Sequence, residues 1–404
     1  MQKESESKYG WIGDCIVSTT ICSQFINSVL CVLTNSYEGY LSYIFIGIAV
    51  LTALYFFLSH FRFQIVTSQV AFAGLLVLGY VLTIVFRGYA TALEPIDFIS
   101  RWMFALFIGM VIPVYPKRTL KIMMLFMIPG VPFLGQIFSK GNVGNYTAIT
   151  MGTSYAILPV ILAAITHYYL YKKEATLFDI FLYIITFVYV VLFIAMSYRG
   201  ALLSMVLLFA LINVFKGEEL LTPGRAILIL GLVSIVVICF EFKSQFLSIL
   251  AGFLSTIGIR IASLDKSIIL LSEGNELHGR LDIFNEAIQG IKNSPIIGHG
   301  YATFRYYTSY VFPHNFILEI LFDFGIPVGG LIILYIIKCL FEKAQNFIKS
   351  NHEMFSFMLL VICCSIPRVL VSSECWIVIS LWYMVGFVTR RNDSLNKSSC
   401  EEPK

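Results

Sequence analysis

The sequence predicts an all-α polytopic integral membrane protein with about twelve transmembrane helices and one long loop domain outside the bilayer. Two observations carry this prediction. Hydrophobic residues make up 58% of the 404 residues and charged residues only 13%, whereas soluble domains are ~45–50% apolar and ~25% charged. Apolar stretches near the ~20 residues that cross a bilayer core also recur along the whole chain. The chain is therefore expected to lie in lipid.

The expected spans form two groups separated by a polar segment. Hydropathy places them near residues 11–33, 39–59, 64–86, 99–115, 119–138, 147–171, 176–196, 200–216, 225–241, 315–341, 353–371 and 374–389. The first is the weakest, because Asp14 and Asn27 interrupt its apolar character. The expected parts are an N-terminal bundle of about nine helices, a loop with amphipathic helices, a C-terminal group of about three helices and a polar tail, at residues 1–241, 242–314, 315–390 and 391–404.

The placement of Lys and Arg predicts the orientation in the membrane. These residues concentrate in alternate connections, most densely in 116–121, 171–175, 338–353 and 389–397. Cytoplasmic loops carry the excess of Lys and Arg in membrane proteins. Both termini are therefore expected in the cytoplasm, and the long loop 242–314 on the opposite side.

The composition argues against several classes of function. No basic run is long enough for a nucleic-acid surface. The nine cysteines lie mostly within or beside apolar spans, so a disulfide framework is not expected. Neither a zinc signature nor a nucleotide-binding signature occurs, so we expect no metal and no cofactor.

The loop 242–314 contains a helix with one apolar side. The segment "RLDIFNEAIQGI" places Leu281, Phe284, Ile288 and Ile291 at helical spacing, with polar residues opposite. The following "SPIIGHG" ends the helix with Pro and Gly. A cluster of aromatic residues at 301–312 then leads back to the membrane.

The next span begins with polar residues that are costly in lipid. In "PHNFILEILFDFG", Pro313 suits a first helical turn, and Asn315, Glu319 and Asp323 follow one another at intervals of four residues on one helix face. His314 lies beside this stripe. Ionisable groups inside a membrane usually face a cavity or a partner. The stripe therefore predicts a site at the outer mouth of this helix, with a packed polar stripe as the alternative, above all for Asp323.

Three arginines lie on the same predicted side. Arg199 occupies a tight turn between two spans, Arg280 begins the amphipathic loop helix, and Arg368 lies near the outer end of an apolar span. Guanidinium groups match phosphate geometry, so their convergence on His314 would suit a diphosphate. The alternatives are headgroup contact for the first, a solvated helix start for the second, and a structural pair with Glu374 for the third.

These residues lie in segments that together resemble a known family. "MSYRGALLSMVLLF", "GRLDIFNEAIQGIKNSPIIGHGYATF" and "PHNFILEILFDFGIPVGG" are similar to the O-antigen ligase/polymerase superfamily, and the resemblance covers residues 195–330. The last segment departs from the pattern, because its second glycine follows Gly325 four residues later rather than three. Among the members, the "PHN" junction followed by "FILEIL" is most like the polymerases.

The resemblance implies a GT-C-like, metal-independent glycosyltransferase at the periplasmic face of the bacterial inner membrane. Its donor and acceptor would be glycans on undecaprenyl diphosphate, and its partners membrane lipids, a flippase and a chain-length regulator. It assigns Arg199 and Arg280 to the diphosphate and His314 to acceptor activation, with Glu319 as a second candidate base. Residues expected to support this site are Asn315, Arg368, His278 and Asp323.

Three functions remain open from the sequence. An O-antigen polymerase joins repeat units while both stay on lipid diphosphate, and the resemblance favours this activity. An O-antigen ligase would instead transfer the finished polymer to lipid A–core. A polysaccharide flippase or another transporter is a third alternative, for which short loops would be expected rather than a loop of roughly 70 residues.

Overall fold

The computed structural model describes residues 2–34, 40–59, 67–87, 99–131, 147–196, 199–215, 252, 256 and 280–390. Every regular element within these ranges is helical. The predicted all-α class is therefore confirmed for the described residues.

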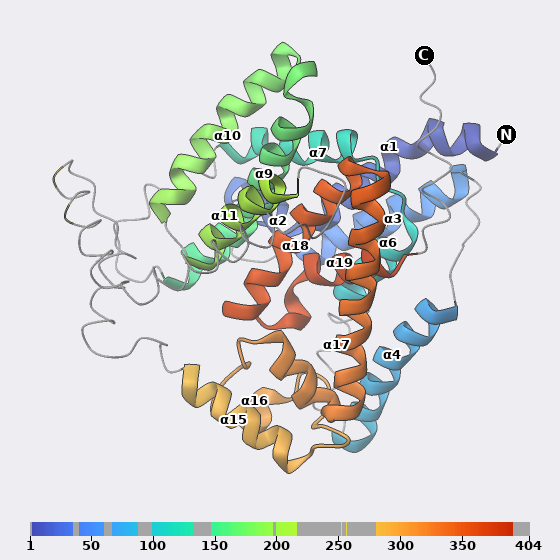
Figure 1. Cartoon of the computed structure of the whole chain (residues 1–404), viewed down its shortest axis with the longest axis vertical. Coiled ribbons are helices and arrows are strands. Elements are labelled where there is room, and N and C mark those ends of the chain that lie inside the picture. Colours follow the sequence, from blue (N-terminus) through green and yellow to red (C-terminus); the bar gives the residue numbers. More distant parts are fainter. Residues whose placement is uncertain are drawn as a thin grey trace.

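The described helices fall into two sets along the chain, and the helices of the first set precede residue 215. They are α1 (Gln2–Ile21), α2 (Ser23–Leu33), α3 (Leu41–Ser59), α4 (Thr67–Arg87), η2 (Ile99–Met103), α6 (Phe104–Val111), α7 (Pro116–Leu125), α9 (Thr147–Tyr171), η3 (Lys172–Glu174), α10 (Leu177–Met196) and α11 (Arg199–Val214). The later elements are α15 (Arg280–Asn293), α16 (Phe304–Tyr307), α17 (Phe316–Ser350), α18 (His352–Val371), η4 (Cys375–Ile377) and α19 (Ile379–Thr389). In Figure 1, α17 runs along the long axis, with α15 and α16 beside its beginning.

Several of these helices are long and apolar enough to cross a membrane. Over the described residues there are five such spans, Leu41–Ser59, Thr67–Val85, Ser154–Glu174, Phe316–Ser350 and His352–Leu370. Tyr9–Ile21 and Ser23–Leu33 make a sixth if they are one span, but they meet at an angle of 74°. The expected total of about twelve is not confirmed, and the span expected at 225–241 lies outside the described residues.

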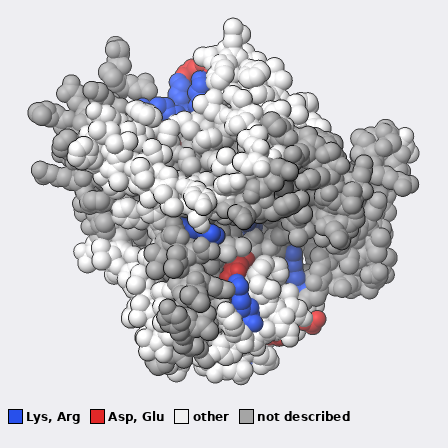
Figure 2. Space-filling view, turned by 180° about the vertical axis from the view of Figure 1, so that it is seen from behind, with Lys and Arg blue, Asp and Glu red and all other residues white. Residues whose placement is uncertain are grey.

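The surface of these helices has the character of a lipid-facing surface. Tyr43, Phe57 and Phe187 on α3 and α10 are 71%, 78% and 69% exposed. Among the described residues in view in Figure 2, Lys, Arg, Asp and Glu gather in a few clusters. Exposed apolar side chains on this scale mark a membrane or interaction surface, so the chain is a membrane protein.

Helix α17 is longer than the sequence predicts. Residues 338–353 were expected to form a connection, but α17 continues through Ser350. Asn351 alone separates it from α18, and its side chain accepts a hydrogen bond from the Met354 N–H at 2.9 Å. The expectation was wrong because a polar stretch in a solvated helix can resemble a loop in composition.

The segment "SPIIGHG" (residues 294–300) packs against a break in α17. Gly325 has φ +73 and ψ +172, which interrupts the helix, and Gly298 also has positive φ. A β-carbon on Gly298 would lie 2.4 Å from the Asp323 carbonyl oxygen. The Ile326 N–H donates to the Pro295 carbonyl at 2.7 Å. The two glycines therefore allow two backbone segments to approach each other closely.

Helix α15 lies against the first half of α17. It buries Ile283, Ala287 and Ile291 in a cluster with Phe304 and Phe322. The apolar side predicted from the sequence is partly wrong, because the side chains of Leu281 and Ile288 are 58% and 40% exposed. Contact with α17 and with Phe304 of α16 selects one line of α15 residues four apart. The domain boundaries themselves remain a prediction.

Candidate functional site

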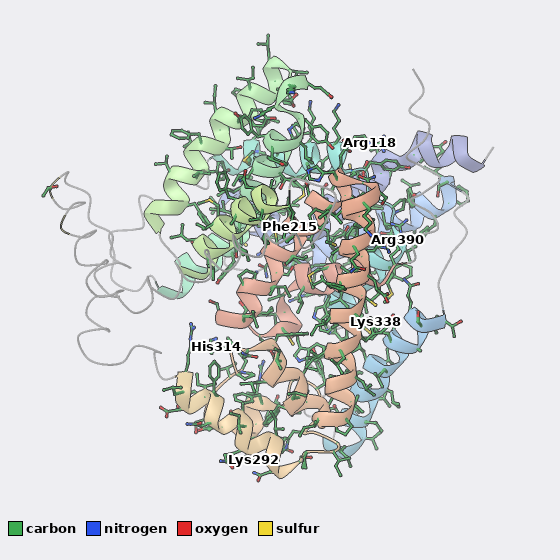
Figure 3. All side chains as sticks on the ribbon, viewed as in Figure 1. Arg118, Phe215, Lys292, His314, Lys338 and Arg390 are labelled. Carbon is green, nitrogen blue, oxygen red and sulfur yellow. The ribbon has the colours of Figure 1, made fainter. Side chains whose placement is uncertain are left out.

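His314 occupies a strained position between the loop and α17. Its φ is +53, a left-handed conformation that is uncommon for residues other than glycine and that recurs at functional sites. The imidazole packs on Phe312 at 4.3 Å between ring centroids, and its Nδ1 is buried without a hydrogen-bond partner among the described residues. Figure 3 shows His314 near the first turn of α15, with Lys292 near the other end of that helix.

The residue after His314 fixes the start of α17. Asn315 is the N-cap, and its Oδ1 accepts hydrogen bonds from the N–H groups of Ile317 and Leu318 at 3.0 and 3.2 Å. An asparagine at this position satisfies backbone donors that the helix cannot pair. Pro313 precedes the cap, so the expectation that it lies in the first helical turn was wrong. The role of Asn315 is to position the backbone that carries His314.

The surroundings of His314 favour its neutral form. Burial and the nearby charge of Arg280 lower its pKa to about 4, opposed by a hydrogen bond with the backbone of Ser372. Burial in a low dielectric and a like charge both disfavour a protonated imidazole. At neutral pH the ring is therefore uncharged and able to accept a proton.

Arg280 is the first residue of α15. Its charge acts on His314 and also on the Tyr155 hydroxyl in α9. Residues far apart in the sequence therefore meet here. The structure brings two of the predicted site residues together, because Arg280 lies close enough for its charge to lower the pKa of His314.

The first turn of α11 also lies next to Tyr155. The side chain of Arg199 is outside the described residues, but α11 begins at this residue. A β-carbon on the next residue, Gly200, would lie 2.1 Å from Tyr155 Oη, and that hydroxyl bonds to Ser372 Oγ at 2.9 Å. The backbone next to Arg199 is thus in contact with Tyr155, while its assignment to the diphosphate remains a prediction.

Arg368 lies beside this group, with partners that differ from those expected. Its Nε donates to Ser373 Oγ at 3.0 Å and its Nη1 donates to Gln24 Oε1. The alternative of a pair with Glu374 was wrong, because Glu374 pairs with Arg305 at 3.2 Å. The backbone between α18 and η4 turns Glu374 away from the arginine six residues before it.

The two carboxylates of α17 have structural partners. Glu319 and Asp323 are only 2% and 1% exposed. Glu319 Oε2 accepts a hydrogen bond from the Cys375 N–H at 2.8 Å, and Asp323 Oδ2 accepts one from Trp376 Nε1 at 2.7 Å. The expected polar stripe facing an open cavity is therefore not seen. These carboxylates hold the η4 segment against α17, and a catalytic role for Glu319 remains a prediction.

Some of the expectations fall on undescribed residues, and some neighbours were missed. His278 lies outside the described residues. Within the described part of the chain, His, Cys, Asp and Glu form no cluster that could hold a metal ion. Sequence reasoning missed Tyr155, Ser372 and Gln24, because nothing in their local sequence distinguishes them from ordinary polar residues of apolar helices.

The comparison with protein families matches this region. Residues 181–334 match the family model described as O-antigen ligase. The match covers 154 of the 404 residues and shows a domain similar to O-antigen ligases. This domain includes Arg199, Arg280 and His314, whereas Tyr155 and Arg368 lie outside it. No curated protein and no solved structure matches the chain.

The O-antigen ligase family covers both ligases and polymerases. Its members are glycosyltransferase-like enzymes of lipopolysaccharide biosynthesis. The family match therefore indicates glycosyltransferase-like chemistry, and it does not distinguish a ligase from a polymerase.

Proposed function

We propose that this protein is an O-antigen polymerase, which joins oligosaccharide repeat units carried on undecaprenyl diphosphate. The observation that carries the proposal is the strained His314, whose buried Nδ1 has no hydrogen-bond partner among the described residues, within range of the Arg280 charge. One group can take a proton from a sugar hydroxyl while the other stabilises an anionic leaving group. Glycosyl transfer from a lipid diphosphate requires both functions.

The reaction can be written on these residues. The acceptor hydroxyl oxygen forms a bond with the anomeric carbon of the donor sugar, and its proton passes to His314. The bond between that carbon and the diphosphate oxygen breaks, and its electron pair leaves with the diphosphate. Arg280, and Arg199 by family resemblance, stabilise this developing charge. No nucleotide or metal enters this scheme.

The polymerase is favoured over the ligase by the sequence around His314. The "PHN" junction and the "FILEIL" that follows it resemble the polymerases. A ligase that transfers polymer to lipid A–core is the second candidate, supported by the description of the matching family. A flippase is a distant alternative, because the described part of the loop packs firmly on α17 through Ile283, Ala287 and Ile291.

The proposed place of action is the periplasmic face of the bacterial inner membrane. Figure 3 shows Arg118, in a predicted cytoplasmic connection, toward the opposite end of the molecule from Lys292 in the loop. This separation supports cytoplasmic termini and a periplasmic site. The substrates would be the lipid-linked donor and acceptor, with a flippase and a chain-length regulator as partners.

Deletion of the gene in the encoding bacterium tests the proposal. Loss of a polymerase should leave lipid A–core capped with a single repeat unit. Loss of a ligase should instead accumulate long chains on undecaprenyl diphosphate. An unchanged ladder of chain lengths on an electrophoretic gel would contradict both activities, and complementation with the wild-type gene is the control.

A further inference from the structure

Arg368 is a half-buried cation whose described partners are all neutral. The guanidinium donates to a serine hydroxyl and to the Gln24 amide oxygen, and it lies 5.0 Å from the centroid of the Tyr155 ring. It forms no ion pair with any described residue. A charge withdrawn from water without a counter-charge is costly. Arginines in this state are suited to bind an anion.

The side chain has hydrogen-bonding capacity left over. An arginine has five N–H donors, and the contacts of Arg368 use only Nε and Nη1. Its Nη2 makes no hydrogen bond with a described residue. The planar guanidinium could therefore offer a further pair of donors to the oxygens of a phosphate group.

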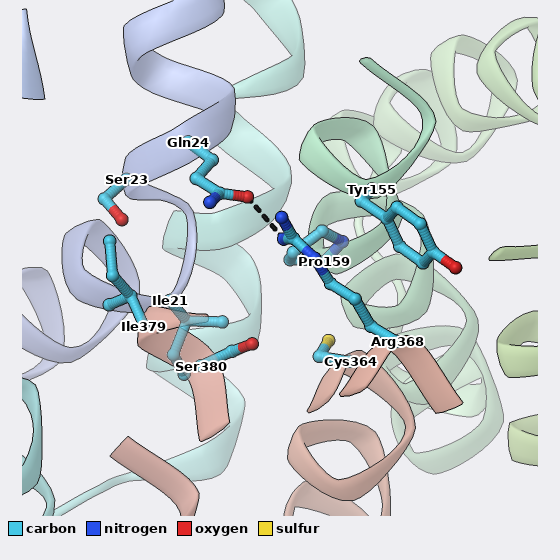
Figure 4. A pocket seen from close by; sticks show the side chains of 9 residues that line it. All are labelled: Ile21, Ser23, Gln24, Tyr155, Pro159, Cys364, Arg368, Ile379 and Ser380. Atoms are coloured by element: carbon cyan, nitrogen blue, oxygen red, sulfur yellow. Dashed lines mark hydrogen bonds between the residues drawn. The ribbon is translucent and has the colours of Figure 1, made fainter. Parts of the chain in front are cut away.

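Arg368 also lines a small cavity. Figure 4 shows its side chain extending from α18 toward Gln24, beside Tyr155 and opposite Ser380. The enclosed space is about that of one water molecule. It is too small for a sugar, but one phosphoryl oxygen could enter while the rest of the anion stays at the mouth.

The cavity adjoins the His314 site through one short segment. The Arg368 carbonyl accepts hydrogen bonds from the N–H groups of Ser372 and Ser373 at 2.9 and 3.1 Å. Ser372 in turn bonds to Tyr155 Oη, and its backbone interacts with His314. The charge of Arg280 also acts on the Tyr155 hydroxyl.

We propose that Arg368 is the cation of a second diphosphate-binding position, separate from the one assigned to Arg199 and Arg280. This inference rests on the proposed polymerase function, because only polymerisation requires two lipid-linked diphosphates at one site. Arg280 on α15 and Arg368 on α18 come from different helices and both act on the Tyr155 hydroxyl, so each can hold one diphosphate while the reacting sugars meet near His314. Arg368 lies outside the residues matched to the ligase family, so the family match does not assign it this role.

Calorimetric titration of the full chain in detergent tests the inference. The probes are farnesyl diphosphate, a short prenyl diphosphate, and inorganic pyrophosphate. The wild-type protein should bind two farnesyl diphosphates. Arg368→Gln should bind one at unchanged affinity and the other about 10- to 100-fold more weakly, as expected for the loss of charge-assisted hydrogen bonds. Arg368→Lys keeps the charge and should lose less.

Matched controls separate binding from folding. Lys292→Gln removes an exposed charge from the loop and should leave both binding events unchanged. A thermal unfolding curve without ligand shows whether Arg368→Gln is folded, and Arg368→Lys provides the folded comparison if it is not. Pyrophosphate should show the same dependence on Arg368, which would assign the contact to the diphosphate rather than to the prenyl chain.

Binding of two farnesyl diphosphates by folded Arg368→Gln with wild-type affinities would overturn the inference and make Arg368 a purely structural residue. Binding of only one by the wild-type protein would also overturn it. The proposed function fails separately, in the deletion experiment. A normal chain-length ladder together with Arg368-dependent diphosphate binding would refute the polymerase and retain the anion site.

Discussion

Two groups of ionisable residues lie within a few turns of each other and differ in how their charges are satisfied. Glu319 and Asp323 on α17 are almost completely buried, and each accepts a hydrogen bond from the η4 segment. Among the residues that the structure describes, the half-buried His314 has no hydrogen-bond partner for its Nδ1, and the partners of Arg368 are all neutral. The first group holds the η4 segment against α17, although Asp323 Oδ1 is buried without a hydrogen-bond partner among the described residues, whereas the second retains hydrogen-bonding groups on a ring nitrogen and a guanidinium that a ligand could use.

This difference indicates how buried charge should be interpreted in this membrane protein. A buried carboxylate that has found backbone and indole donors stabilises a tertiary contact. A guanidinium or imidazole that keeps one hydrogen-bonding group without a partner carries an energetic penalty that a substrate can relieve. We therefore propose that the incomplete pairing of His314 and Arg368 marks the site, and the following predictions test that distinction.

The largest effect is expected for His314→Asn. Asparagine tolerates the left-handed backbone at this position but cannot act as a base, so the polymerisation rate should fall about 10²- to 10⁴-fold. The measurement is repeat-unit addition by purified protein, with thermal unfolding as the control for folding. Wild-type rates in a folded His314→Asn protein would exclude His314 as the base.

The contact between the loop and α17 should be sensitive to a single methyl group. Gly298→Ala places a β-carbon against the Asp323 carbonyl on a residue with positive φ, and should reduce the free energy of unfolding by more than ~1 kcal/mol. Gly330→Ala, later in α17 and with open space around it, is the matched control and should be neutral or stabilising by up to ~1 kcal/mol. Equal unfolding temperatures for the two variants would contradict the close approach.

The pH dependence should reflect the lowered pKa of His314. A base that titrates at about 4 remains neutral through pH 5, so the acid limb of kcat/KM should lie near 4 rather than near ~6.5. Arg280→Gln removes a like charge and should move that limb to higher pH, even though the overall rate is lower. An acid limb near ~6.5 in the wild-type protein would contradict the described environment.

The same pKa shift has a consequence for stability. Because the folded state holds His314 neutral, the unfolded chain takes up its proton first as the pH falls below ~6.5. The contribution of this residue to stability should therefore decline between pH ~6.5 and about 4. In His314→Asn this part of the pH dependence should be absent, as judged by unfolding midpoints across that range.

The smallest effect on catalysis is expected for Glu319→Gln. The glutamine amide oxygen can still accept from the Cys375 N–H, so the η4 segment stays in place, with a stability loss of ~0.5–1.5 kcal/mol. The polymerisation rate per folded molecule should change little. Loss of activity in a well-folded Glu319→Gln protein would instead make Glu319 the base and reverse the comparison between the two groups.

The sequence predicted the class of this protein and part of its site. Hydropathy gave an all-helical membrane protein, and helical spacing together with Pro and Gly gave α15 and the turn that follows it. The polar residues at the start of α17 drew attention to His314, whose role remains a prediction. These features are local in the chain, because helix formation and lipid exposure depend on residues a few positions apart.

The tertiary structure decided which polar residues are free to act. It paired Glu319 and Asp323 with the η4 segment, gave Glu374 to Arg305, and placed Arg368 against Gln24, 344 positions away in the chain. It also selected the line of residues that α15 buries. The spacing of residues along the sequence does not predict such contacts, because they depend on which helices pack together. This packing decides whether a buried charge has a partner within the protein or can bind a ligand.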